Sequence, residues 1–129
     1  QLARANARAL QARVDFLHCD LASALNTRFP LIVSNPPYIP AREIPTLQRE
    51  VRDHEPHLAL LGGEDGTEIY HRIVPQAERL LEPGGWLIFE IGYQGEAQVR
   101  AAFGPQWQDL RTGYDLSGWP RVIRARYAP

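Results

Sequence analysis

Methionine and lysine are absent from this 129-residue chain, and cysteine occurs only once, as Cys19. A single cysteine excludes an internal disulfide bond and a zinc site made of several cysteines. The formal net charge of −1 gives no electrostatic basis for non-specific binding to nucleic acid or to a membrane. No apolar run approaches the roughly 20 residues of a membrane-spanning helix. We therefore expect a cytoplasmic monomer that binds neither membranes nor nucleic acid directly.

The sequence begins with a helical composition that has no helix start signal before it. Gln1–Ala12 is rich in alanine and arginine, which is typical of a helix, yet no residue that favours a helix N-cap stands before it. We therefore expect a fragment of a longer protein that begins inside a helix.

Apolar periodicity predicts an α/β fold in which strands and helices alternate. The stretch Leu31-Ile32-Val33 is continuously apolar, as in a parallel strand that is buried on both faces. The last two strands read as a hairpin-like pair, so we expect a mostly parallel sheet with an antiparallel edge. Cys19 is expected to be a small buried residue in its strand. Helices are predicted at 1–12, 65–82 (kinked or split at Pro75) and 94–104, and strands at 13–19, 29–35, 86–92, 107–114 and 121–127.

Between the second of these strands and the second helix lies a long, charged segment that prolines interrupt. It runs from Pro36 to Gly63 without a regular pattern. Long irregular segments in compact domains are usually lids or binding loops, so we expect a functional role here. The turn "EPGG" (Glu82–Gly85) is expected to separate the next helix from its strand.

The heptapeptide "SNPPYIP" places an asparagine directly after the apolar strand and then two prolines. In open parallel sheets, ligands bind at the carboxyl ends of the strands, where Asn35 stands. Pro36 and Pro37 each have a fixed φ angle, and each holds the residue before it in an extended conformation. Neither proline offers a backbone N–H group. The result is a stiff pair of hydrogen-bond acceptors, the Asn35 amide oxygen and a proline carbonyl, with the aromatic face of Tyr38 beside them.

A rigid pair of acceptors suits a ligand NH₂ group, whose two hydrogens it holds while the nitrogen faces an electrophile. Orientation of this kind lowers a barrier by several kcal/mol or more, and an aromatic face favours a sulfonium cation by roughly 0.5–2 kcal/mol. The alternative is a plain extended loop, or an SH3 ligand, because Pro37–Pro40 matches the loose PxxP pattern.

The motifs taken together resemble the HemK/PrmC family of protein-(glutamine-N5) methyltransferases. The resemblance covers essentially the whole chain, and its motifs occur in order: "LIVSNPPYIP", "EVRDHEP", "LALLGGEDG", "LEPGGWLIFEIGYQ" and "DLSGWPRVIRA". It implies a Rossmann-like class I fold and methyl transfer from S-adenosylmethionine to the glutamine of the Gly-Gly-Gln motif in peptide chain release factors.

The resemblance also implies roles for single residues. Asn35, Pro36, Pro37 and Tyr38 would bind the substrate glutamine, with Asn35, Pro36 and Tyr38 closest to the chemistry. For the cofactor, the implied contacts are Asn35, Asp20 and Leu21; Leu21 stands where relatives carry an aromatic residue. The residues that would shape the site without taking part in the chemistry are Glu90, Gly92 and Gln94.

The chain departs from the family pattern at its start. The glycine-rich loop that follows the family's first strand, and the acidic residue after its second strand, are not found in the sequence. We therefore expect residues 1–129 to be the C-terminal portion of one methyltransferase domain, inactive and unstable alone. Alternatives are a ribosomal-protein glutamine methyltransferase, an adenine-N6 methyltransferase of nucleic acid, and a non-catalytic peptide-binding fragment.

Other chemistry-bearing residues have simpler interpretations. His54 and His57 are three residues apart but have no third ligand nearby, so no metal site is expected. The charged run Glu50–Glu55 is either a solvated helix face or a docking surface for a protein substrate. Trp86, Trp107 and Trp119 are expected to anchor the core or its rim.

Overall fold

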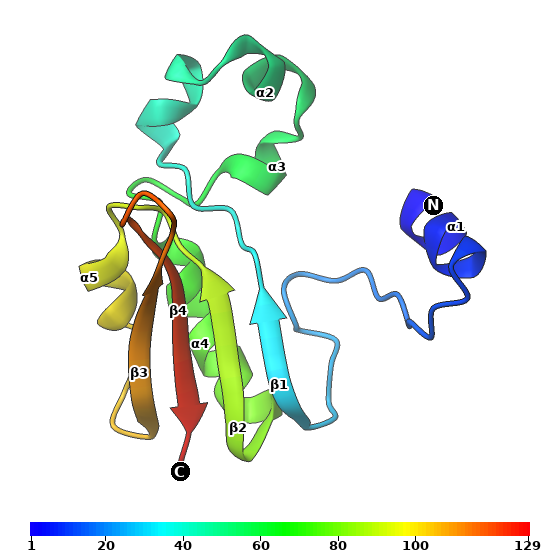
Figure 1. Ribbon diagram of the computed structural model, residues 1–129, viewed down its shortest axis with the longest axis vertical. Coiled ribbons are helices and arrows are strands. Elements are labelled where there is room, and N and C mark those ends of the chain that lie inside the picture. The colour runs from blue at the N-terminus through cyan, green and yellow to red at the C-terminus, as the bar shows by residue number, and fades with distance from the viewer.

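Four strands form one sheet in the computed structural model, which describes residues 1–129 (Figure 1). A helix packs beside the sheet, three short helical turns lie above one of its edges, and a first helix lies apart from it. In chain order the elements are α1 (Leu2–Ala9), β1 (Phe29–Ser34), the 3-10 helix η1 (Ala41–Thr46), α2 (Arg49–His54), α3 (His57–Leu60), α4 (Glu68–Leu80), β2 (Leu81–Glu90), α5 (Glu96–Arg100), β3 (Trp107–Tyr114) and β4 (Pro120–Tyr127). None of the helices combines the length and the apolar character that crossing a membrane requires.

The strand order is β1-β2-β4-β3, with β1 and β2 parallel and the other two pairings antiparallel. The predicted fold class, a sheet with parallel strands and an antiparallel edge, is therefore confirmed. Ser34 lies opposite Phe89, and Glu90 lies opposite Val122. Because β4 is antiparallel to β2, the carboxyl ends of β1 and β2 lie at the same end of the sheet as the start of β4. We call this end of the strands the carboxyl edge, as distinct from an edge strand, which lacks a neighbour on one side.

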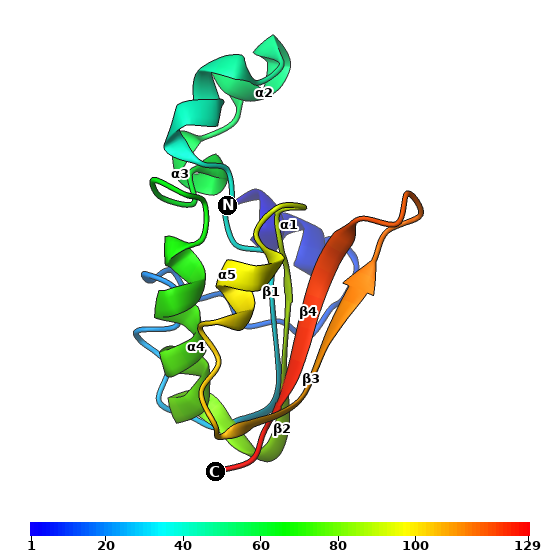
Figure 2. The same cartoon turned by 90° about the vertical axis from the view of Figure 1, so that its left-hand side faces the viewer.

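The hydrophobic core lies between α4 and one face of the sheet, and α5 covers the same face (Figure 2). Buried residues recur along α4 at helical spacing, as expected for an amphipathic helix. Each large apolar side chain that is fully buried contributes roughly 1.5–3 kcal/mol. Pro75 is exposed inside α4, and the helix continues through it as one element, so the predicted split is wrong. The core residues are Tyr70, Ile73, Val74, Ala77, Leu81, Leu87, Phe89, Ile91, Val99, Trp107, Ile123 and Ala125.

The "EPGG" segment is not a separate turn before β2 but an irregularity inside it. Phe29 pairs with Leu81, and the next paired residue of β1, Leu31, lies opposite Trp86. The intervening residues of β2 therefore loop out of register. Gly84 takes a φ of 85°, a left-handed conformation that a glycine adopts without strain.

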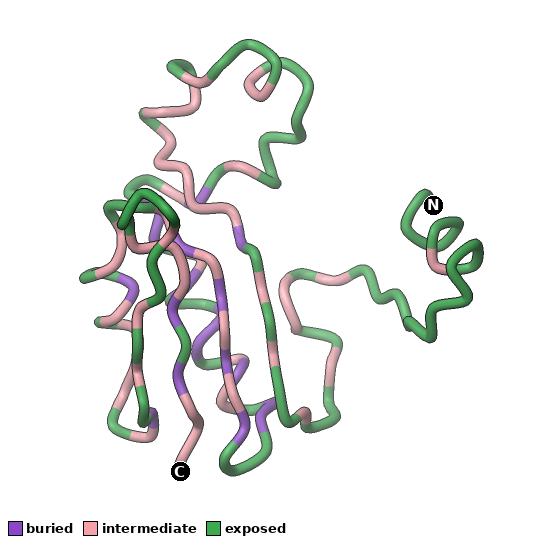
Figure 3. Tube along the Cα trace, in the orientation of Figure 1, coloured by how far each residue is buried: buried purple, intermediate pink, exposed green.

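Residues 13–19 form no strand, which corrects the prediction made from their alternating pattern. A strand needs a neighbour to accept and donate its backbone hydrogen bonds, and none lies beside this segment. Its apolar side chains Val14, Phe16 and Leu17 are exposed instead. Figure 3 colours most of the trace between α1 and β1 as exposed. Cys19 is only partly buried, in a bend, where its thiol donates to the carbonyl of Leu21.

Strand β1 is covered on one face only, and that face is only partly buried, so the expectation of burial on both faces is also wrong. Ile32 packs against the core under α4. Leu31 and Val33 point the other way and are 50% and 67% exposed. No strand pairs with β1 on the side away from β2. The isolated chain thus presents an apolar surface next to an unpaired strand edge, the usual template for association.

We predict that Val33→Lys reduces self-association of the 129-residue chain. The added charge falls on an exposed side of an edge strand and removes little buried contact, so it opposes edge-to-edge pairing. Sedimentation velocity at several concentrations measures the effect. Leu58→Lys, at a residue that is 90% exposed in α3, is the control and leaves association unchanged. A parent chain that stays monomeric at every concentration would contradict the prediction.

Candidate functional site

Asn35 follows the last residue of β1 and stands exposed at the carboxyl edge. Pro36 is buried directly after it, and Pro37 and Tyr38 are partly buried. The chain thus leaves the sheet through a buried proline, while the side chain of Asn35 stays accessible. This is the arrangement that the "NPPY" motif predicts: a stiff backbone with a polar amide at its end.

The segment after Tyr38 is pinned by backbone pairing. The N–H of Ile39 donates to the carbonyl of Leu60 at 2.9 Å, and the N–H of Gly62 donates to the carbonyl of Ile39 at 2.9 Å. The N–H of Ala41 donates to the carbonyl of Gly63, also at 2.9 Å. These bonds join the two ends of the segment 41–60, which we call the lid. The lid is therefore held at its base to the chain that carries Tyr38.

Glycines make this close pairing possible. A Cβ on Gly62 would lie 2.7 Å from the Cα of Tyr38 and 2.9 Å from the carbonyl oxygen of Pro37. Gly66, with a φ of 82°, packs against the carbonyl oxygen of Tyr38 so closely that any Cβ would overlap it. Gly62 and Gly66 thus leave room for the backbone of residues 36–40, which we call the proline segment and which a side chain at either glycine would push away.

The Tyr38 side chain is oriented by β2. Its hydroxyl donates to Oε1 of Glu90 at 3.1 Å, and its ring lies against Gly92, where a Cβ would stand 3.2 Å from the ring atom Cδ2. The hydroxyl of Tyr70, from α4, donates to the backbone carbonyl of Glu90 at 2.9 Å. Glu90 therefore accepts one hydrogen bond from a tyrosine hydroxyl at its carboxylate and another at its backbone carbonyl.

Both tyrosines stay protonated at neutral pH. Burial, and then the adjacent Glu90 carboxylate, raise the pKa of Tyr38 above its ordinary value, while Arg121 acts in the opposite direction. Burial is also the main cause that raises the pKa of Tyr70. In each case the charged phenolate is disfavoured, so the tyrosines act as hydrogen-bond donors.

A cavity of about 260 Å³ opens beside Tyr38, below the lid. Its walls include Tyr38 and Tyr70, Thr67 at the start of α4, Tyr93 after β2, and Arg121 at the start of β4. Asn35 does not line it, so the amide and the cavity are separate features that flank the proline segment. Space is thus present next to Tyr38, but on the side of the antiparallel strands.

The start of β4 is held by a carboxylate in the preceding turn. Asp115 accepts hydrogen bonds from the backbone N–H groups of Ser117 and Trp119 at 2.9 and 3.0 Å. It also accepts from Nη2 of Arg121 at 3.3 Å. These donors lower the pKa of the Asp115 carboxyl, the Trp119 N–H contributing most. The Arg121 guanidinium is thereby held at the cavity beside Tyr38.

The predicted cofactor residues, Asp20 and Leu21, lie beside α4 on the other side of β1. The exposed carboxylate of Asp20 pairs with Arg72. Leu21 takes a φ of 52° and lines an apolar cavity of about 250 Å³ together with Ser34. Residues 20 and 21 thus lie on the side of β1 that faces away from the antiparallel strands, close to the strand end that carries Asn35.

Curated relatives decide between the possible families. No family model matches the chain. A release factor glutamine methyltransferase of Koribacter versatilis is 44% identical over 128 residues, which is 98% of this chain and 45% of that protein. One from Bradyrhizobium diazoefficiens is 47% identical over 123 residues, 93% of this chain and 41% of that protein. The chain belongs to the release factor glutamine methyltransferase family. It spans less than half of the length of these relatives.

Solved structures agree on the fold. A methyltransferase from Pyrococcus furiosus superposes with a TM-score of 0.67 at 13% identity, over 98% of this chain and 56% of that one. TrmN from Thermus thermophilus gives 0.62 at 21% identity, over 98% of this chain and 32% of that one. At these identities the likeness concerns the fold alone. The sheet and its helices are thus part of a class I methyltransferase fold.

Some residues of the site are indicated by the sequence, and others are not. Glu90 and Gly92 contact Tyr38, and Gln94 donates to the hydroxyl of Tyr93 at 2.6 Å on the cavity wall. Arg121 received no role, although it lies in the family-like string "DLSGWPRVIRA". Tyr70 was missed because a helical tyrosine at core spacing gives no sign of its hydroxyl's partner.

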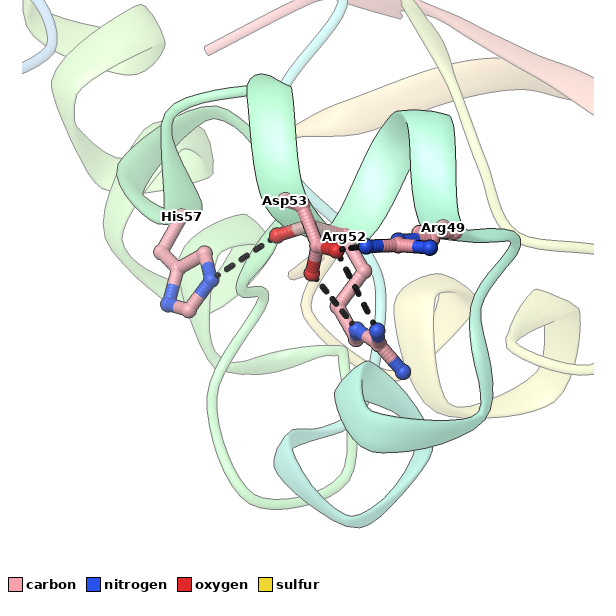
Figure 4. A network of polar contacts seen from close by, with 4 residues as sticks. All are labelled: Arg49, Arg52, Asp53 and His57. Atoms are coloured by element: carbon pink, nitrogen blue, oxygen red, sulfur yellow. Dashed lines mark hydrogen bonds and ion pairs between the residues drawn. The ribbon is translucent and has the colours of Figure 1, made fainter.

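The lid is helical rather than irregular, with η1, α2 and α3 above the carboxyl edge (Figure 1). None of the three buries a residue. In α2, Arg52 and Arg49 donate to Asp53 at 2.8 and 3.3 Å, and the His57 ring contacts the carbonyl of Arg52 at 3.3 Å (Figure 4). The charged run therefore pairs within itself in an exposed segment that is anchored only at its base.

We predict that Glu90→Gln lowers the pKa of Tyr38. The amide keeps an oxygen that accepts from the tyrosine hydroxyl but removes the negative charge that opposes ionisation. Ultraviolet titration of tyrosinate formation in the variant and its parent measures the change. Glu96→Gln is the control, because Glu96 accepts from Thr112 and not from a tyrosine. Superimposable titration curves for Glu90→Gln and the parent would contradict the prediction.

Proposed function

We propose that the protein to which this chain belongs transfers a methyl group from S-adenosylmethionine to a side-chain amide nitrogen of glutamine. The proposed substrate is the glutamine of the Gly-Gly-Gln motif in peptide chain release factors. The names of the curated relatives support the substrate. The observation that carries the chemistry is the exposed Asn35 at the carboxyl edge, followed by the buried Pro36 and by a backbone that is paired from Ile39 onward.

Asn35 and Pro36 position the substrate amide. The side-chain oxygen of Asn35 and the carbonyl of Pro36 accept the two amide hydrogens, which leaves the face of the nitrogen free. An amide nitrogen is a weak nucleophile because its lone pair is delocalised, so fixed orientation supplies much of the catalysis. Pro37 stiffens the segment, and Tyr38, locked on Glu90, forms its aromatic wall. No general base is needed, because the methylated nitrogen is strongly acidic and loses its proton to water.

Asp20 and Leu21 fit the adenine end of the methyl donor. Leu21 faces an apolar cavity that Ser34 also lines, which suits a flat ring near the end of β1. The exposed Asp20 carboxylate is an acceptor for an amino group, and Arg72 holds it in place. When bound, S-adenosylmethionine supplies an electrophilic methyl group. Asn35 stands between this region and the cavity beside Tyr38.

We further propose that residues 1–129 are the C-terminal portion of one methyltransferase domain. The relatives are more than twice as long as the matched region. The unpaired edge of β1 and the exposed Leu31 and Val33 support further strands and helices from the remaining chain at this place. The complete domain would act in the cytoplasm as a monomer, where release factors take part in translation.

Incubating the full-length protein with a release factor and S-adenosylmethionine tests the function. We expect mass spectrometry to find one added methyl group on the glutamine of the Gly-Gly-Gln motif and none on other glutamines. Methylation of a ribosomal-protein glutamine or of adenine in nucleic acid, with the release factor unchanged, would overturn the proposed substrate. Binding of the release factor without any methyl transfer would indicate a peptide-binding protein.

We predict that Asn35→Ala in the full-length protein lowers the rate of methyl transfer by more than about 100-fold. The amide of the substrate glutamine loses the side-chain oxygen that accepts its hydrogen and orients it. The fold stays intact because the Asn35 side chain is exposed. Single-turnover kinetics and circular dichroism measure the two quantities. Asn26→Ala, at an exposed asparagine before β1, is the control and keeps the parent rate. A variant that retains near-parent turnover would remove Asn35 from the mechanism.

A further inference from the structure

Four apolar or aromatic side chains are exposed where β3, β4 and the end of β2 meet the carboxyl edge. We call them the aromatic rim, and they are Tyr93, Tyr114, Leu116 and Trp119. Tyr93 and Trp119 contact each other edge to face, with ring centroids 5.4 Å apart and planes at 74°. Leu116 is fully exposed at the tip of the turn between β3 and β4. Such a cluster on a surface marks a binding site more often than isolated apolar residues do.

The aromatic rim is continuous with the candidate site. Tyr93 belongs both to the rim and to the wall of the cavity beside Tyr38. Arg121, two residues after Trp119, lines the same cavity and is held by Asp115 in the turn. A ligand that occupies the cavity therefore meets the rim without crossing another element.

Sheet geometry sets the distance between the rim and Asn35. Trp119 precedes β4, which lies two strands from β1 in the order β1-β2-β4-β3. At about 4.8 Å for each strand step, the two residues are roughly 10 Å apart across the strands. Ser34 is level with Ile123 through Phe89, so Trp119 also stands about three residues, or roughly 10 Å, farther along the strand direction than Asn35. The total separation is therefore roughly 14 Å. An extended peptide advances about 3.3 Å per residue, so about four residues span this gap.

The charge and chemistry of the rim favour a polypeptide. The Asp115 carboxylate and the Arg121 guanidinium pair with each other, so the turn adds no strong field for an anionic ligand. Tyrosine and tryptophan combine flat apolar faces with hydrogen-bond donors, and for that reason they are enriched where proteins contact proteins. Glycine-rich backbone, which has no side chains to obstruct it, lies well against such faces.

We propose that the aromatic rim binds the segment of the protein substrate that flanks the reacting glutamine, through residues about four positions from it. The inference rests on the proposed function and adds a subsite to it. Asn35 and Pro36 hold the amide, the segment crosses the cavity beside Tyr38, and the Tyr93–Trp119 pair holds the flanking residues. Recognition of the protein and positioning of the amide are thus assigned to opposite ends of the same edge.

The test compares Trp119→Ala with the parent, both as full-length proteins, on two peptides. The long peptide carries Gly-Gly-Gln with about five further residues on each side, and the short one is Gly-Gly-Gln with blocked ends. We expect Trp119→Ala to raise the KM for the long peptide about tenfold, as a central aromatic contact does. The KM for the short peptide, which does not reach the rim, stays at the parent value.

Two variants serve as controls. Trp119→Phe keeps an aromatic ring against Tyr93 and restores most of the affinity for the long peptide. Leu10→Ala, at an exposed residue that follows α1 away from the sheet, changes neither KM. Calorimetric titration with S-adenosylmethionine verifies that Trp119→Ala binds the donor like the parent.

The outcomes separate the subsite from the function. An unchanged KM for the long peptide in Trp119→Ala, or an equal rise for both peptides, overturns the rim proposal while the proposed function stands. If the parent methylates neither peptide nor a release factor, the proposed function fails and the rim proposal fails with it. A rise for the long peptide alone supports both.

Discussion

The hydrogen bond from the Tyr38 hydroxyl to Glu90 ties the loop that carries the candidate site to the centre of the sheet. Glu90 is the last residue of β2, a strand that pairs with both β1 and β4. Tyr70 adds a second hydroxyl to the main chain of the same residue, so α4 is fastened there as well. One position thus fixes the proline segment, the central strand and the covering helix relative to one another.

The site combines prolines that restrict the backbone with glycines that allow close packing. Pro36 restricts the backbone of Asn35 and Pro37 restricts that of Pro36, which fixes the point from which the exposed asparagine side chain extends. Gly62, Gly66 and Gly92 do the opposite, because each leaves room for the backbone or ring of the proline segment to come close. The main chain thus determines where the Asn35 side chain stands at the end of β1.

The sequence predicted those features that depend on neighbours along the chain. The apolar runs located β1 and β2, the alternating stretches located β3 and β4, and the prolines marked the exposed Asn35. It failed where the partner is distant. Residues 13–19 have the pattern of a strand, but strand formation depends on an adjacent strand that pattern alone does not supply. The partnership of Tyr38 with Glu90 spans 52 positions, and only the folded sheet brings them together.

The pinned base of the lid has a consequence for how these proteins diverge. Because Ile39, Ala41 and Gly62 close the segment with backbone bonds, its two ends stay in register whatever lies between them. Doubling the length of a flexible loop whose ends are already joined costs only about 0.6 kcal/mol. The segment that forms η1, α2 and α3 can therefore be lengthened, shortened or recharged at little cost, while the corner beneath it, where Asn35 stands, stays unaltered.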